Sequence, residues 1–128
     1  MIEDKDYITR LIHQTVRTLV RLIWNRDMDK GEEGAVSFAL LQRYQELAKM
    51  IDEGKVNEAE NLLLDELDPE DQEYFQMALC FYEKLGGKSE EFLTEHDYSQ
   101  QEVIDGLKYV VETYGYTDFL EVISEELA

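Results

Sequence analysis

Hydrophobic residues recur through most of the chain at steps of three and four positions, the spacing that places side chains on one face of an α-helix. The pattern is clearest in residues 6–25 and about 35–53. Four later segments repeat it, beginning near Asn57, Pro69, Ser99 and Thr117. In no stretch do apolar and polar residues alternate as in a half-buried strand. The pattern therefore predicts an all-α protein of five to seven helices.

Residues that favour helix ends mark the boundaries of the second, third and fourth helices. Gly54 is expected in the left-handed conformation just after the second helix. Asn57, followed three positions later by Glu60, predicts a capping box at the start of the third helix. Asp68 and Pro69 predict the start of the fourth, because proline is favoured at the first helical position. The second and third helices are separated by so short a turn that they must pack as a hairpin.

The fourth predicted helix is apolar on nearly all sides. Nine of residues 74–85 are apolar, and a helix of that kind is buried, so we place it at the centre of the fold. The pair Gly86-Gly87 ends it. A short helix is predicted over 89–95, and the Ser-Gln-Gln-Glu motif at 99–102 is a capping box for the helix that follows. No linker interrupts this succession, so the whole chain is expected to form a single domain.

One predicted hairpin resembles a tetratricopeptide repeat. The likeness covers residues 44–67, and its best match is the Gly-Lys-x-x-Glu-Ala stretch from Gly54 to Ala59. In that family a small residue at the Ala59 position lets two helices approach closely. The large aromatic and the small residue expected early in the first helix are missing. Both a tetratricopeptide-like helical array and an irregular helical bundle therefore remain open.

Over its full length, residues 1–128, the chain also resembles a family of short, acidic bacterial proteins that carries only a domain-of-unknown-function label. The segments that carry this resemblance are Asp6–Ile12 and Gly54–Asn61. The resemblance implies a cytoplasmic helical domain. It transfers no catalytic or ligand-binding residue, because the family offers none.

Charge is abundant and unevenly distributed. The chain carries 12 basic and 30 acidic side chains, a net charge of −18. Such a surface repels phosphate, so no nucleic-acid partner is expected. Residues 1–30 carry a net charge of +1 and residues 31–128 a net charge of −19, and residues 7–26 contain four arginines and no carboxylate. The first helix is therefore basic and the remainder acidic.

Motifs that carry chemistry are sparse. The loop Asn25–Gly31 resembles a helix–loop–helix calcium site because oxygen ligands recur at alternate positions. Its glycine falls one place late and Val36 stands where a bidentate glutamate belongs, which favours a solvated acidic loop. The adjacent Glu-His-Asp at 95–97 places three potential ligands together, but adjacent residues rarely converge on one metal ion because their side chains point in different directions. His13 has no evident carboxylate partner and is expected on a half-exposed polar face. We predict no catalytic residue, no cofactor and no metal ligand.

The single cysteine, Cys80, cannot form an internal disulfide, so a reducing, cytoplasmic setting is expected. Its place in the most apolar helix favours a buried structural role over an activated thiolate. Basic residues interrupt the first apolar positions, which is unlike a signal peptide. The longest apolar run, Met77–Tyr82, is far too short to span a membrane.

The basic face of the first helix is the strongest functional lead. Arg10, Arg17 and Arg21 are aligned on it, and Trp24 lies near the same end. Three interpretations remain open. The arginines pair with acidic helices of the same domain or face water; they bind a partner protein, for which arginine and tryptophan are favoured anchors; or they make a weak contact with a membrane surface.

From these features we predict a non-catalytic helical protein-interaction module that binds a protein partner or self-associates. Such a module should expose an apolar–aromatic patch, for which Trp24 and the tyrosines at 109, 114 and 116 are candidates. The alternatives are a helical enzyme or metal-binding protein of an unfamiliar type, and a peripheral membrane protein that binds through the first helix.

Overall fold

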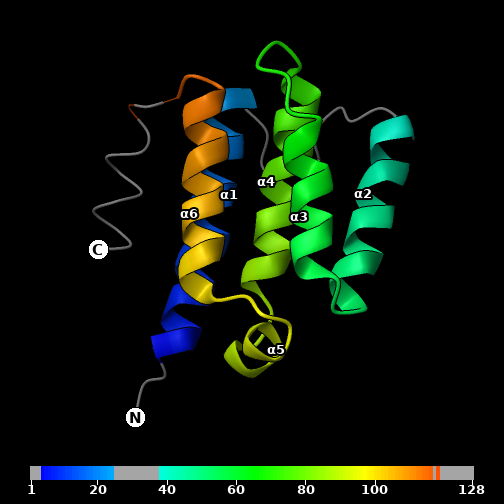
Figure 1. The fold of residues 1–128 in the computed structure, drawn as a ribbon. Helices are drawn as coiled ribbons and strands as arrows, with labels where there is room; N and C mark the ends of the chain where they lie inside the picture. Colours follow the sequence, from blue (N-terminus) through cyan, green and yellow to red (C-terminus); the bar gives the residue numbers. More distant parts are fainter. Residues whose placement is uncertain (1–3, 25–37, 117, 119–128) are drawn as a thin grey trace.

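The computed structural model describes residues 4–24, 38–116 and 118 (Figure 1). These residues form six α-helices and contain no strand, which confirms the all-α prediction. The helices are α1 (Asp4–Trp24), α2 (Phe38–Asp52), α3 (Val56–Asp65), α4 (Gln72–Gly86), α5 (Glu90–Glu95) and α6 (Gln100–Thr113). No helix in the described part of the chain is long and apolar enough to cross a membrane.

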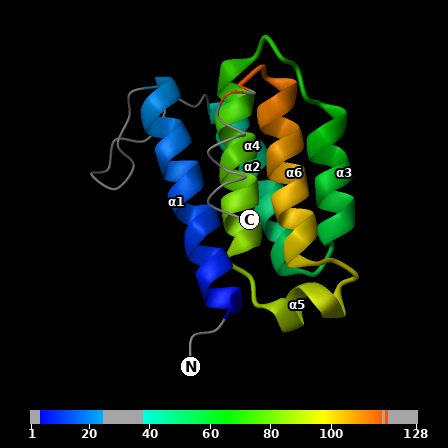
Figure 2. The ribbon, with the colours of Figure 1, turned by 90° about the vertical axis from the view of Figure 1, so that its left-hand side faces the viewer.

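Helix α4 lies at the centre, as its apolar sequence predicts. Helices α1 and α6 pack against one side of it and α2 against the other, while α3 lies beside α2 and α5 crosses one end of the bundle (Figures 1 and 2). Most of α4 is buried, and its half-buried residues are Cys80, Glu83 and Lys84. Cys80 is therefore less deeply buried than the sequence predicts.

Two glycines let the outer helices approach closely. A Cβ atom at Gly86 of α4 would lie 2.9 Å from Cγ2 of Ile12, which α1 inserts into the core. A Cβ atom at Gly106 of α6 would lie 2.5 Å from a ring carbon of Tyr82. Real Cβ atoms do not tolerate such distances, so the absence of a side chain at these positions sets the spacing of α1 and α6 from α4.

The hairpin of α2 and α3 forms as predicted, but the start of α3 differs. Gly54 has a φ of +86°, the left-handed conformation expected of it. The N-cap of α3 is Lys55, whose side chain makes no capping hydrogen bond. Asn57 instead donates through Nδ2 to the carbonyl oxygen of Asp97, at 3.0 Å. The predicted Asn57–Glu60 capping box is therefore wrong, because the side chain of Asn57 forms a tertiary hydrogen bond and does not cap α3.

The start of α4 is also later than predicted. The side chain of Asp71 caps the helix by accepting a hydrogen bond from the backbone nitrogen of Tyr74, at 3.1 Å. Asp68 Oδ1 accepts one from the nitrogen of Glu70, at 3.0 Å, which holds residues 68–71 in a turn. Pro69 therefore lies in this turn and does not begin the helix.

The later boundaries agree with the sequence. Ser89 caps α5, and Gly87 is the C-cap of α4. Both reciprocal bonds of the Ser99–Glu102 capping box are present at the start of α6. The calcium-like loop at 25–31 and the final helix predicted after Thr117 lie outside the described residues.

A polar cluster joins three parts of the bundle. The hydroxyls of Tyr82 on α4 and Tyr98, just before α6, both donate to Oε2 of Glu60 on α3, at 2.7 and 2.9 Å. Both tyrosines are buried, and Glu60 is half-buried. A buried phenol needs such a partner, because an unsatisfied hydroxyl in the core costs stability.

Candidate functional site

The arginines of α1 lie in two different environments. Arg10 and Arg21 are exposed, and neither forms an ion pair with another residue in the ranges that the structure describes. Arg17 is half-buried and its Nε donates to Oε2 of Glu83 on α4, at 3.1 Å. Intramolecular pairing, one of the three interpretations of the basic face, therefore applies to Arg17. The side chain of Trp24 is outside the described residues.

Glu83 is the centre of a three-residue charge cluster between α1 and α4. Nδ1 of His13 lies 2.6 Å from the same Oε2 atom that Arg17 contacts. The exposed fractions of the side chains are 16% for Glu83, 21% for Arg17 and 49% for His13. The half-exposed position of His13 is as predicted, but the expectation that it lacks a carboxylate partner is wrong.

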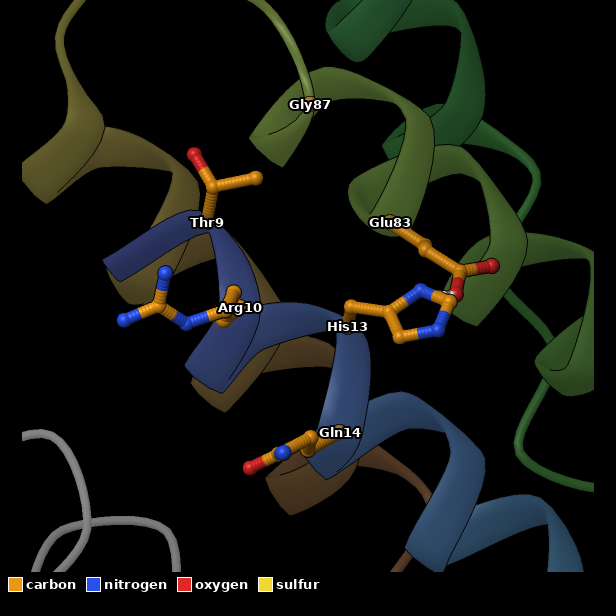
Figure 3. Close-up of a pocket in the computed structure, with 6 residues that line it drawn as sticks. All are labelled: Thr9, Arg10, His13, Gln14, Glu83 and Gly87. Carbon is orange, nitrogen blue, oxygen red and sulfur yellow. Dashed lines mark ion pairs between the residues drawn. The ribbon is translucent and has the colours of Figure 1, made fainter. Parts of the chain in front are cut away.

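A pocket of about 300 Å³ opens beside this cluster (Figure 3). Its lining comes from α1 and from the C-terminal end of α4, and consists of Thr9, Arg10, His13, Gln14, Glu83 and Gly87. The ring of His13 points toward Glu83, whereas the side chains of Arg10 and Gln14 point away from that pair (Figure 3). The guanidinium of Arg10 therefore lies at the rim, separate from the His13–Glu83 contact.

The neighbouring lysines are held by a different carboxylate. Lys84 and Lys88 place Nζ at 3.2 and 2.6 Å from Oδ1 of Asp52 on α2. Their hydrogen bonds lower the pKa of the Asp52 carboxyl. Because Asp52 holds both lysines on the α2 side, the cation that pairs with Glu83 is Arg17 of α1.

The predicted tyrosine patch does not form. Tyr114 is only 7% exposed, and its ring stacks on Phe75 with centroids 4.4 Å apart. Tyr116 is half-buried and stacks on the same ring at 5.3 Å. Tyr109 is exposed. The two stacked tyrosines therefore belong to the core and its edge.

Sequence reasoning missed both Glu83 and an exposed apolar pair on α2. Glu83 is the one carboxylate within the apolar stretch 74–85, and a charged residue in such a stretch is a signal that it has a partner. Phe38 and Leu41, one turn apart on α2, are 73% and 46% exposed. Their spacing is helical, but it does not reveal that they are exposed in the folded chain.

The residues considered for metal binding or reactivity have structural contacts. Nδ1 of His96 lies 2.7 Å from the carbonyl oxygen of Phe92, and its ring lies against Gly54. Among the described residues, no three His, Cys, Asp or Glu side chains are grouped so that they could hold a metal ion.

Residues 1–115 match the model of a family of unknown function, DUF6483. No curated protein and no solved structure matches the chain. The matched segment runs from α1 to the end of α6 and contains every residue that lines the pocket.

Proposed function

The chain belongs to DUF6483, a family of unknown function, and we propose that it is a non-catalytic helical module that binds an acidic protein partner. The proposed binding surface is the basic edge of α1, which we define as Arg10, Arg17, Arg21 and Trp24. The observation that carries the proposal is the exposure of Arg10 and Arg21 without an ion pair to another described residue.

Arg10 and Arg21 differ in this respect from the two other described arginines, Arg17 and Arg43, which both contact glutamates. Among the other described cations, Arg43 contacts Glu46 and Glu66, and Lys84 and Lys88 contact Asp52, whereas Lys49 and Lys108 form no ion pair with another described residue. A guanidinium offers a planar fork of donors that matches a carboxylate. The side chains of Arg10 and Arg21 are therefore available to carboxylates from outside the chain, and the favoured partner is acidic.

Contact with a membrane through α1 is less well supported. The apolar face of α1 is buried in the bundle, where Ile12, Val16 and Val20 are at most 1% exposed. An interfacial helix must place that face among lipid chains. Helix α1 would have to leave α4 and α6 before that face could reach lipid.

The tetratricopeptide likeness is part of the same proposal. It is supported by the three-residue turn between α2 and α3 and by Ala59, whose side chain is fully buried where α3 meets its neighbours. A hairpin of this kind is a common element of helical modules that bind other proteins.

The proposal is tested by capturing partners from the native cell with the wild-type chain and with the double variant Arg10→Glu/Arg21→Glu. The control is Lys49→Glu/Lys55→Glu, which changes the net charge equally at two exposed lysines of the α2–α3 hairpin. We expect the α1 variant to bind a captured partner at least about tenfold more weakly, since each exposed ion pair contributes up to ~1 kcal/mol and reversal adds repulsion.

The control variant should retain wild-type affinity. Equal binding by the wild type and the α1 variant would remove α1 as the binding surface. Equal loss in both double variants would show that only the overall charge matters.

A further inference from the structure

We propose that the pocket between α1 and α4 accepts one carboxylate side chain of the acidic partner, with Arg10 as the group that binds it. This inference rests on the proposed function and assigns a specific contact to it. The pocket, of about 300 Å³, is larger than a carboxylate group alone, so it has room for the aliphatic stem of a glutamate as well.

Arg10 is placed to bind such a group. Its side chain lines the pocket, is exposed and points away from Glu83 (Figure 3), and it forms no ion pair with any residue of the described ranges. Its five N–H groups are therefore available, and a carboxylate can accept two of them side by side. The hydroxyl of Thr9 and the amide of Gln14 supply further donors in the same lining.

Glu83 does not cancel this attraction. Its Oε2 atom lies within 3.1 Å of Arg17 and 2.6 Å of His13, so its negative charge is already compensated inside the protein. The charge of Asp52 is likewise compensated by Lys84 and Lys88. Within the described lining, Arg10 therefore remains the cation without an ion pair, and its charge favours an anion beside it.

The same arrangement favours a monoanion over a dianion. Glu83 still lies in the pocket wall, and repulsion between its carboxylate and a bound anion grows with the charge of that anion. A carboxylate carries one negative charge, whereas a phosphate monoester carries up to two near neutral pH. The expected ligand is therefore a carboxylate, and inorganic phosphate serves as the competing anion in the test.

The test is a titration of the isotope-labelled full chain with a hexaglutamate peptide, followed by amide NMR shifts. We expect the largest shifts at Thr9, His13 and Gly87. Arg10→Ala should weaken binding at least about fivefold, and Arg10→Lys should recover only part of the loss because it keeps the charge without the planar fork. Lys49→Ala, at an exposed lysine on α2, is the matched control and should bind as the wild type does.

A steric variant separates the pocket from general electrostatics. Gly87 is exposed and has a φ of −84°, so a larger residue fits its backbone. Gly87→Leu should fill the pocket mouth and abolish the shifts at Thr9 and His13 while all the arginines remain. Unchanged peptide binding by this variant would overturn the inference.

Three further outcomes of the titration show whether the pocket or the whole basic edge of α1 has failed as the binding surface. Peptide binding that depends on Arg21 but shifts no pocket residue overturns the pocket and leaves the basic edge of α1 as the binding surface. No binding of hexaglutamate by the wild type also overturns the pocket, and the partner capture then decides the proposed function alone. Inorganic phosphate that produces the same shifts at lower concentration overturns the choice of carboxylate.

Discussion

The carboxylate of Glu60 shows what a single polar side chain contributes to this bundle. It accepts hydrogen bonds from Tyr82 and Tyr98, and so links α3, α4 and the segment that leads into α6. We expect Tyr98→Phe to lower the free energy of unfolding by about 1–2 kcal/mol, because the carboxylate loses one of two phenol donors. Urea denaturation measures this loss.

The exposed Tyr109 on α6 supplies the matched substitution. Tyr109→Phe should change the free energy of unfolding by less than about 0.5 kcal/mol, as exposed positions usually do. If both substitutions had the same small effect, the Glu60 hydrogen bonds would contribute nothing to stability.

Buried tyrosines also determine how the protein responds to alkali. Burial raises the pKa of Tyr44 to about 12, and it raises the pKa values of Tyr82 and Tyr98, where the charge of Glu60 adds to the effect. A phenol whose pKa is higher in the folded than in the unfolded chain holds its proton more tightly when folded. Its contribution to stability is complete below about pH 10, where tyrosine in an unfolded chain ionises, and is lost as the pH rises further.

We therefore expect the urea midpoint to fall steeply between about pH 10 and pH 12, with tyrosinate absorbance appearing together with the loss of helical circular dichroism. The comparison point is about pH 8, where these phenols are protonated in both states. Complete tyrosine ionisation near pH 10 in a chain that stays helical would contradict the expected protection.

At the scale of elements, the packing of α1 against α4 depends on the absence of a side chain at Gly86. Alanine is the better helix former by about 1 kcal/mol, so propensity alone predicts that Gly86→Ala stabilises α4. The added methyl would meet Ile12 at 2.9 Å, and overpacking of a core usually costs about 1–3 kcal/mol. We expect the clash to outweigh propensity, with a lower urea midpoint and faster hydrogen exchange in α1.

Gly87→Ala is the control for this substitution. A Cβ atom there would meet only backbone oxygens, at 3.4 Å or more, and the residue has a negative φ. It should leave the stability unchanged or slightly increased. A stabilising Gly86→Ala would show that α1 can shift to accommodate the methyl group.

Elements were predictable from sequence where their signals are local. The Ser99–Glu102 capping box and the left-handed Gly54 depend on neighbours a few positions away, and both are present. Asn57 has the same kind of local signal, yet its side chain donates a hydrogen bond to the carbonyl oxygen of Asp97. That contact forms only in the folded bundle, because the two residues are 40 positions apart. Asp68 and Asp71 both carry the local signal of a cap before α4, and the structure uses Asp71 as the N-cap and Asp68 in the preceding turn.

Only the α1 residues of the candidate site were predictable from sequence, and the α4 residues were not. The alignment of Arg10, Arg17 and Arg21 follows from helical spacing within α1. Glu83 lies on another helix, α4, and nothing in the spacing of α1 shows that Arg17 will contact this carboxylate. Residues within a helix follow from its period, whereas contacts between helices depend on rotation and register.

At the scale of the whole molecule, the net charge of −18 opposes folding, whereas the local positive charge of Arg10 and Arg21 favours binding of an acidic partner. The 30 carboxylates far exceed the 12 cations, so the folded chain repels itself, and salt screens that repulsion. Binding of an acidic partner to Arg10 and Arg21 is an attraction, and salt weakens it. The same change in ionic strength should therefore stabilise the fold and release the partner.

We expect the urea midpoint to rise, and partner affinity to fall by about tenfold or more, as NaCl increases from about 0.02 M to about 0.5 M and the Debye length shortens severalfold. Chloride is preferred to sulfate, which stabilises folded proteins by exclusion from their surface. Affinity that rises together with stability would indicate an apolar contact, for which the exposed residues include Leu22 on α1 and Phe38 and Leu41 on α2. The direction of the salt effect on binding thus distinguishes a contact through the arginines of α1 from a contact through exposed apolar side chains.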